Sequence, residues 1–246
     1  MMDGKRGAEV WYLFNSGFAV KLGGRMLIFD YYHLKPFQKL KGLDGGVIDA
    51  EELKDLEVTV FASHAHMDHF NPAVLKWGRD IPKLRYVLSS DINAGPTPNV
   101  TTAYPNAAFR AGEIEIRTLK STDEGIAFIV EAEGLKIYHA GDLNWWHWEG
   151  EPDDENRVMA ETYKAEIDKL KGETFDIAFV PVDPRLENAY LLGLDYFMKT
   201  CDARVVFPMH FRNGYSIFNR IMSDPDTECY RANVVKITRR GERFEV

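Results

Sequence analysis

The chain has 246 residues, of which 45% are apolar and 28% are charged, a composition that excludes wholesale disorder. Its 30 basic and 38 acidic residues give a formal charge of −8 without a clustered basic run, so nucleic acid is a disfavoured partner. No stretch approaches the ~20 apolar residues of a membrane span, and residues 1–6 lack the apolar core of a signal peptide. We therefore expect a cytoplasmic protein that does not enter a membrane, with Cys201 and Cys229 as reduced thiols.

The first half of the chain is predicted to consist mainly of strands. Residues 10–14, 18–20 and 26–30 are apolar and separated by turn signals, which predicts a β-meander. Residues 51–53 suit a short helix. The continuous apolar run 58–62 indicates a buried strand, and Asn71 and Pro72 then predict the start of a helix. Further strands are expected at 84–89, 113–119, 126–131 and 135–139, the last two as a hairpin.

In the second half, predicted helices alternate with strands. The spacing of apolar residues predicts helices over 153–171 and 188–200. Strands are expected over 175–180, 204–207, 233–238 and 242–246. Because no linker rich in Pro or Ser divides the chain, we expect one domain over 1–246, an α/β fold with two sheets inside and helices outside.

The strongest chemical signal is a cluster of four potential metal ligands directly after the strand 58–62. His64, His66, Asp68 and His69 fall within six residues. Side chains at i and i+2 of an extended segment point the same way, so His64 and His66 can converge on one point. The following turn can bring Asp68 and His69 to an adjacent point. Imidazole and carboxylate together suit Zn, Mn or Fe.

This pattern resembles the signature of the metallo-β-lactamase superfamily, and the resemblance extends over nearly the whole chain. The sequence Tyr-His-Ala-Gly-Asp at 138–142 resembles the strand that delivers the family's bridging Asp, and 205–210 resembles the strand that delivers its last His. The compact branch that includes the L-ascorbate-6-phosphate lactonases is the most similar. The resemblance implies a four-layer αββα sandwich, α/β (α+β) in class, with two metals at one edge of the sheets.

The resemblance also implies a ligand set. His64 and His66 would bind a first metal ion, and Asp68, His69 and His210 a second, with Asp142 between the two. Taken alone, Asp142 or His210 would be weak evidence, since a Gly-Asp pair is more often a turn. Their order and context beside the His-rich motif make the set specific.

The sequence departs from the family at one ligand. The family usually supplies a further His to the first metal, and residues 119–125 contain none. Asp123 is the best substitute, ahead of Ser121 and Glu124, and a carboxylate there would shift preference toward Mn or Fe. The alternative is that Asp123 caps a turn and the first site is defective. We therefore predict one or two divalent ions per chain.

Several neighbouring residues are candidates for other roles. His139 is either a buried, hydrogen-bonded His or a group that orients a ligand or moves a proton. Trp145, Trp146 and His147 belong to a Trp-rich segment that suits a pocket wall, a plug over the core or an oligomer contact. Arg185 suits an anionic substrate group, although a lone Arg is more often structural.

We interpret the chain as a hydrolase in which metal-activated water attacks an ester, lactone or phosphoester of a small, anionic molecule. Asp68 or Asp142 would accept the proton, and His139 or His147 would serve the leaving group. One alternative is a phosphodiesterase or nuclease of the same superfamily, although the chain has no room for the extra domain those proteins usually carry. Another is a non-catalytic protein with a degenerate metal site. A homo-oligomer also remains open.

Overall fold

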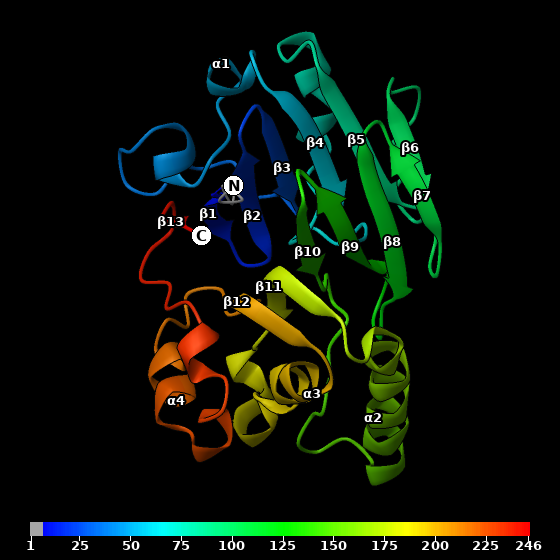
Figure 1. Ribbon diagram of the computed structural model, residues 1–246, viewed down its shortest axis with the longest axis vertical. Helices are drawn as coiled ribbons and strands as arrows, with labels where there is room; N and C mark the ends of the chain where they lie inside the picture. Colours follow the sequence, from blue (N-terminus) through cyan, green and yellow to red (C-terminus); the bar gives the residue numbers. More distant parts are fainter. Residues whose placement is uncertain (1–6) are drawn as a thin grey trace, which may run out of the picture.

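The computed structural model describes residues 7–246 and contains two β-sheets that face each other (Figure 1). Residues 1–6, where the sequence indicates no signal segment, lie outside the described residues. The first sheet has seven strands in the order β13-β1-β2-β3-β4-β5-β6. In chain order its strands are β1 (Glu9–Phe14), β2 (Gly17–Leu22), β3 (Arg25–Phe29), β4 (Glu57–Ala62), β5 (Leu84–Ser89), β6 (Val100–Ala103) and β13 (Arg243–Glu245).

The second sheet has six strands in the order β12-β11-β10-β9-β8-β7. They are β7 (Ala108–Ala111), β8 (Ile114–Lys120), β9 (Ile126–Ala132), β10 (Leu135–His139), β11 (Thr174–Pro181) and β12 (Asp202–Met209). The β9–β10 hairpin was predicted, and so was the antiparallel meander of β1, β2 and β3; both are confirmed.

Aromatic side chains pack between the two sheets. Phe18 of β2 lies 4.3 Å from Phe179 of β11 between ring centroids, and Phe61 of β4 lies 5.3 Å from Phe128 of β9. All four are fully buried. Because side chains alternate along a strand, the opposite faces of the same strands remain for helices to cover.

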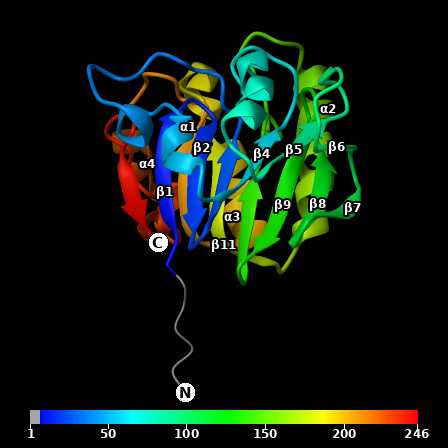
Figure 2. The ribbon, with the colours of Figure 1, turned by 90° about the horizontal axis from the view of Figure 1, so that it is seen from above.

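Helices cover the outer faces of both sheets. They are α1 (Ala50–Leu53), α2 (Asp153–Ile167), α3 (Leu192–Thr200) and α4 (Ile217–Ser223). Figures 1 and 2 show α2, α3 and α4 on one side of the sheets and α1 on the opposite side. The predicted αββα layering is thereby confirmed. None of the helices among residues 7–246 is both long and apolar enough to cross a membrane.

Several predicted elements differ in detail. The segment that begins at Asn71 is a 3-10 helix, Pro72–Arg79, although the Asn71 side chain caps it as expected by accepting from the Ala73 N–H. The predicted strand at 233–238 is wrong, because Val234 forms only an isolated bridge with Val206 of β12. Strands β6 and β7 and helix α4 were missed. All three are short, with four, four and seven residues, which leaves little periodicity to detect.

The topology brings the ends of five strands to one edge of the sandwich. Strands β3 and β4 are parallel with Phe29 opposite Phe61, so the residues that follow them emerge side by side. In the second sheet β10, β11 and β12 are also parallel, with Pro181 of β11 opposite Met209 of β12. Ligands commonly bind beyond the carboxyl ends of strands in such layered folds.

Candidate metal centre

The turn after β4 folds the imidazoles of its histidines toward one another. Nε2 of His64 lies 3.0 Å from Nδ1 of His66, as expected for two side chains that converge on one point. The His69 N–H donates to the His66 carbonyl at 3.0 Å, which turns the chain back, and the His69 ring lies 4.1 Å from that of His64 between centroids. His64 and His69 are fully buried, whereas His66 is exposed.

Asp142, which follows β10, points its carboxylate at three imidazoles. Its oxygens lie 3.5 Å from Nε2 of His64, 3.1 Å from Nε2 of His69 and 3.5 Å from Nε2 of His210. Burial raises the pKa of the Asp142 carboxyl, but the imidazoles of His69 and His210 outweigh burial and lower this pKa. Asp142 therefore lies at the centre of the cluster as a carboxylate.

The remaining sequence-predicted ligands complete two further groups around this centre. Asp68, His69 and His210 form one group, and His66, Asp123 and Asp142 form another; in each, the ligand atoms lie within 4.8 Å of one another. His64, His69 and Asp142 form a third group of the same size. The structure thus brings all seven predicted metal-binding residues together, including Asp123 in the place of the absent His.

Two buried carboxylates that sequence reasoning did not assign to the site hold the imidazoles from behind. Asp30 accepts from Nδ1 of His69 at 2.7 Å, and Asp183 accepts from Nδ1 of His210 at 2.9 Å. This contact leaves Nε2 of each ring directed at the cluster. Carboxylates commonly hold metal-binding histidines from behind in this way. Each of these acids directly follows an apolar run at the end of a strand, a signal that could have identified them.

The same carboxylates carry further contacts that fix their charge. Asp30 also accepts from the Ser63 N–H at 2.8 Å and the Ser63 hydroxyl at 2.7 Å. Burial raises the pKa of the Asp183 carboxyl, but hydrogen bonds from His210 and Arg185 lower it to about 2. Both acids are buried, so their carboxylates interact with the imidazoles and other protein groups and not with solvent.

Two atoms at the centre of the cluster fit a bound cation. Nε2 of His69 and Oδ1 of Asp142 are buried and lie 3.1 Å from each other, but within residues 7–246 neither makes a hydrogen bond of adequate geometry. A buried polar atom without a partner costs about 1–3 kcal/mol, so native proteins rarely keep one without a reason. An imidazole nitrogen and a carboxylate oxygen aimed at the same space are the donor types that divalent metals prefer.

Two glycines allow the loops of the second sheet to reach the His-rich turn. Gly141 has φ +54°, and a Cβ there would lie 2.6 Å from Cβ of Ser63. Gly125 has φ +74°, and a Cβ there would lie 2.0 Å from the Ser63 carbonyl oxygen. Only glycine adopts this conformation at so close an approach. Asp123 and Asp142 can therefore reach His64 and His66 from the opposite sheet.

A cavity of about 320 Å³ opens above these donors. Among the residues that line it are Asp68, Asp123, Asp142, Trp146, Arg185 and Arg212. Trp146 is held in place because its Nε1–H donates to the Asp142 carbonyl at 2.9 Å. Arg185 makes a two-pronged ion pair with Asp183, with Nε 3.0 and 2.9 Å from the two carboxylate oxygens. Arg185 is thus both a structural residue and part of the cavity wall.

The structure decides between the two interpretations of His139 and corrects those of Trp145 and His147. His139 is the buried, hydrogen-bonded His of the first alternative and not a leaving-group residue: it is fully buried, its Nε2 lies 2.9 Å from the Ser16 carbonyl oxygen, and its ring stacks on Phe29. Trp145 is not among the residues that line the cavity. It packs under the ammonium group of Lys164, 4.3 Å from the ring centroid.

His147 does not line the cavity either, because the segment turns there and sends alternate side chains away from it. Trp146 and Trp148 stack on each other with centroids 6.1 Å apart, and both line the cavity. Trp146 and Trp148 therefore form part of the cavity wall, and an oligomer contact at this segment stays a prediction.

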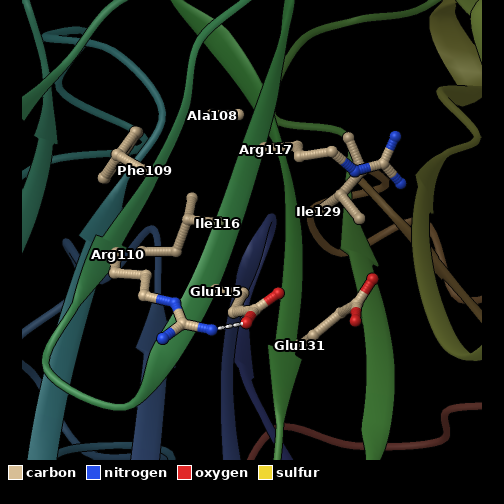
Figure 3. A pocket seen from close by; sticks show the side chains of 8 residues that line it. All are labelled: Ala108, Phe109, Arg110, Glu115, Ile116, Arg117, Ile129 and Glu131. Atoms are coloured by element: carbon tan, nitrogen blue, oxygen red, sulfur yellow. Dashed lines mark hydrogen bonds and ion pairs between the residues drawn. The ribbon is translucent and has the colours of Figure 1, made fainter.

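A second hollow, of about 460 Å³, lies on the outer face of β7, β8 and β9 (Figure 3). Its charged groups pair with one another or with a neighbour: Arg110 with Glu115, and Arg117 with Glu173. No side chain that lines it belongs to the ligand groups described above.

Comparisons with known proteins identify the family. The model of the beta-lactamase superfamily domain matches residues 9–151, more than half of the chain, so the chain belongs to that family. Together with the donor set, this makes the protein a metal-dependent hydrolase of the metallo-β-lactamase superfamily. A search of curated proteins finds no match.

Solved structures share the fold. Igni18, a metallo hydrolase from the archaeon Ignicoccus hospitalis, is 18% identical with a TM-score of 0.62, and the alignment covers 98% of both chains. The metallo-β-lactamase fold protein YhfI from Bacillus subtilis is 15% identical with a TM-score of 0.61, over 98% of this chain and 100% of that one. CmlA, a diiron β-hydroxylase from Streptomyces venezuelae, is 12% identical with a TM-score of 0.55, over 82% of this chain and 44% of that one.

Proposed function

We propose that the protein uses water activated by one or two divalent metal ions to cleave an ester, lactone or phosphoester bond in a small anionic molecule. The observation that carries this proposal is the convergence of the predicted ligand atoms, which form three groups whose members lie within 4.8 Å of one another around the buried His69 and Asp142. The similarity to the ascorbate-6-phosphate lactonase branch stays a prediction, and it makes lactones the first substrates to try.

The proposed metal ligands divide into two sets that share Asp142. His64, His66 and Asp123 would hold the first ion, and Asp68, His69 and His210 the second. The second set is itself one of the groups of ligand atoms, whereas the first draws on two of them, because His66 and Asp123 group with Asp142, and His64 groups with Asp142 and His69. Because Asp123 offers a hard carboxylate oxygen in place of an imidazole, Mn or Fe is favoured over Zn. The diiron description of CmlA is a precedent for iron within the same fold.

When bound, such ions lower the pKa of water toward neutrality and polarise the bond under attack. Asp142 is only 7% exposed in its side chain, and its oxygens face three imidazoles. Asp68 lines the cavity and is about 31% exposed in its side chain, so we assign proton acceptance to Asp68. Arg212, whose Nη2 lies 3.4 Å from Oδ2 of Asp68, holds that carboxylate in place.

The cavity wall supports an anionic substrate. Arg185 and Arg212 both line it and are about half exposed, which leaves donors available to a carboxylate or phosphate. The flat face of Trp148, with the Arg185 guanidinium 5.5 Å from its ring centroid, forms the adjoining wall. A small molecule is favoured because the cavity has the volume of an ordinary ligand site.

Two measurements test the proposal. Elemental analysis of the purified protein should find one to two equivalents of Mn, Fe or Zn, and no bound metal even after reconstitution would overturn the ligand assignment. A panel of lactones, esters, phosphomonoesters and phosphodiesters should then be assayed with each metal. Turnover of phosphodiesters alone would favour the phosphodiesterase alternative. Metal binding without any turnover would favour the non-catalytic alternative.

A further inference from the structure

A second concavity adjoins the metal cavity on its other side. It has a volume of about 670 Å³ and is lined by Phe14, Tyr32, Ala65, His66, Met67, Asp68, Arg212 and Asn213. Three of these residues, His66, Asp68 and Arg212, also line the metal cavity. The two concavities therefore adjoin each other, and the residues they share include the proposed metal ligand His66 and the proposed proton acceptor Asp68.

The part of this concavity away from the metal ligands is apolar. The rings of Phe14 and Tyr32 lie 6.2 Å apart between centroids, and Met67 stands at the mouth with 88% of its surface exposed. We call the surface formed by Phe14, Tyr32 and Met67 the aryl groove. A flexible thioether held out of the core, beside two aromatic rings, is suited to contact an apolar ligand group.

The wall of the aryl groove is held rigidly by one buried cation. Arg240, from the loop before β13, is only 5% exposed. Its guanidinium donates to backbone carbonyls on both sides of the groove wall: those of Leu13, His33, Lys35 and Gly46. Since these carbonyls flank Phe14 and Tyr32, the groove is formed before any ligand arrives, which reduces the entropic cost of binding.

The two sides of the reacting centre differ in charge. On the metal-cavity side, Arg185 presents a cationic group; Arg212 lines both concavities, and the aryl groove presents rings and a thioether. We propose that the substrate is an anion that also carries an aryl group: the anionic end lies against Arg185 and Arg212, and the aryl group lies in the aryl groove. The bond to be cleaved then lies above His66 and Asp68. This inference rests on the proposed hydrolase function.

Benzyl hemisuccinate and methyl hemisuccinate form a matched pair of substrates for the test. In each, water adds across the acyl C–O bond: the acyl carbon gains the hydroxyl, the alcohol oxygen takes the proton, and succinate and an alcohol leave. Only the benzyl ester can fill the aryl groove. We expect its kcat/KM in the metal-loaded wild-type enzyme to exceed that of the methyl ester by about tenfold or more, from burial of the ring.

Variants of groove residues test whether the preference for the benzyl ester arises in the aryl groove. Met67→Gln keeps the size of an exposed side chain but makes it polar, and Tyr32→Ala removes one ring. Each should reduce the benzyl-to-methyl ratio by about threefold or more. The matched control is Leu40→Gln, a similar change at a side chain that is 40% exposed and outside the groove, and it should leave the ratio unchanged. A wild-type ratio near one, or a ratio that neither groove variant alters, would overturn the inference.

A binding measurement separates this inference from the proposed function. If the wild-type enzyme cleaves neither ester, calorimetry of the metal-loaded protein with 4-phenylbutyrate and butyrate still reports on the groove. Binding of 4-phenylbutyrate at least about tenfold tighter, and weakened in Met67→Gln, would support the groove while hydrolysis of these esters fails. Equal affinity for the two acids would overturn the groove whatever the enzyme hydrolyses.

Discussion

The metal cavity and the hollow on β7, β8 and β9 are both lined by charged side chains, yet their charges are arranged in opposite ways. In the hollow, Arg110 pairs with Glu115 and Arg117 with Glu173, on side chains that are largely open to water. In the metal cavity, Arg185 and Arg212 are about half exposed, whereas His69, Asp142 and His210 at its centre are buried. There, Nε2 of His69 and Oδ1 of Asp142 lie 3.1 Å apart without a hydrogen bond of adequate geometry among residues 7–246.

This difference shows that the way charged groups are paired, and not the volume of the cavity, distinguishes the functional site. The hollow is the larger of the two, at about 460 Å³ against about 320 Å³. Exposed ion pairs contribute at most about 1 kcal/mol and need no further partner. Buried imidazole and carboxylate groups that converge without well-formed hydrogen bonds at their centre cost free energy in the protein alone, so their retention indicates a ligand that completes their contacts.

The largest expected effect comes from the centre of the metal cavity. Asp142→Ala removes the carboxylate shared by both ligand sets, so we expect turnover to fall by more than about a hundredfold and metal content to drop. Glu115→Ala in the hollow should alter neither. Kinetics, elemental analysis and circular dichroism of both variants provide the measurement. Unchanged turnover in a folded Asp142→Ala protein would refute the role of Asp142.

Two glycines in left-handed conformations provide the next comparison. Gly141→Ala would place a methyl group 2.6 Å from Cβ of Ser63, so we expect a loss of about 3 kcal/mol or more in unfolding free energy. Gly134, in the β9–β10 hairpin, has φ +79° and open space around it, so Gly134→Ala should cost only about 1 kcal/mol. Urea unfolding measures both, and equal losses would contradict the close approach at Ser63.

Asp183→Asn tests the carboxylate behind His210. The amide keeps the shape but loses the charge that orients the ring, so affinity for the second ion should fall by about 10–100-fold. Chelator competition gives the dissociation constant. The unchanged affinity expected of Glu115→Gln supplies the reference, and a similar result for Asp183→Asn would show that His210 needs no such support.

The smallest expected effect lies at the rim of the hollow. Burial raises the pKa of the Glu173 carboxyl, but Arg117 and Lys136 outweigh it and lower this pKa. A lowered folded-state pKa means that the stabilisation is complete above the unfolded-state pKa and is lost as the pH falls. Glu173→Gln should therefore cost at most about 1 kcal/mol at pH 7, and less as the pH is lowered from about 5. A difference in unfolding free energy that grows on acidification would contradict this sign.

Much of the fold followed from local patterns, and the misses have a common cause. The long apolar runs of β4 and β11 and the periodicity of α2 are strong signals, because each buries a face of regular spacing. The predicted strand at 233–238 failed because its valines pack beside β12 with only one bridge to it. Burial produces the same hydrophobicity whether or not a ladder of hydrogen bonds forms. The single-domain prediction and the cytoplasmic location stay predictions.

The sequence by itself determined which residues could serve as ligands in the proposed metal centre, because the chemistry needs particular residue types at the ends of particular strands. His64, His66, Asp68 and His69 lie within one turn, and their spacing carries the information. The tertiary structure alone decided which carboxylates stand behind the rings, that His139 is buried, and that an aryl groove adjoins the metal cavity. Each of these depends on side chains from strands far apart in the chain, and their distances are fixed only when the two sheets pack.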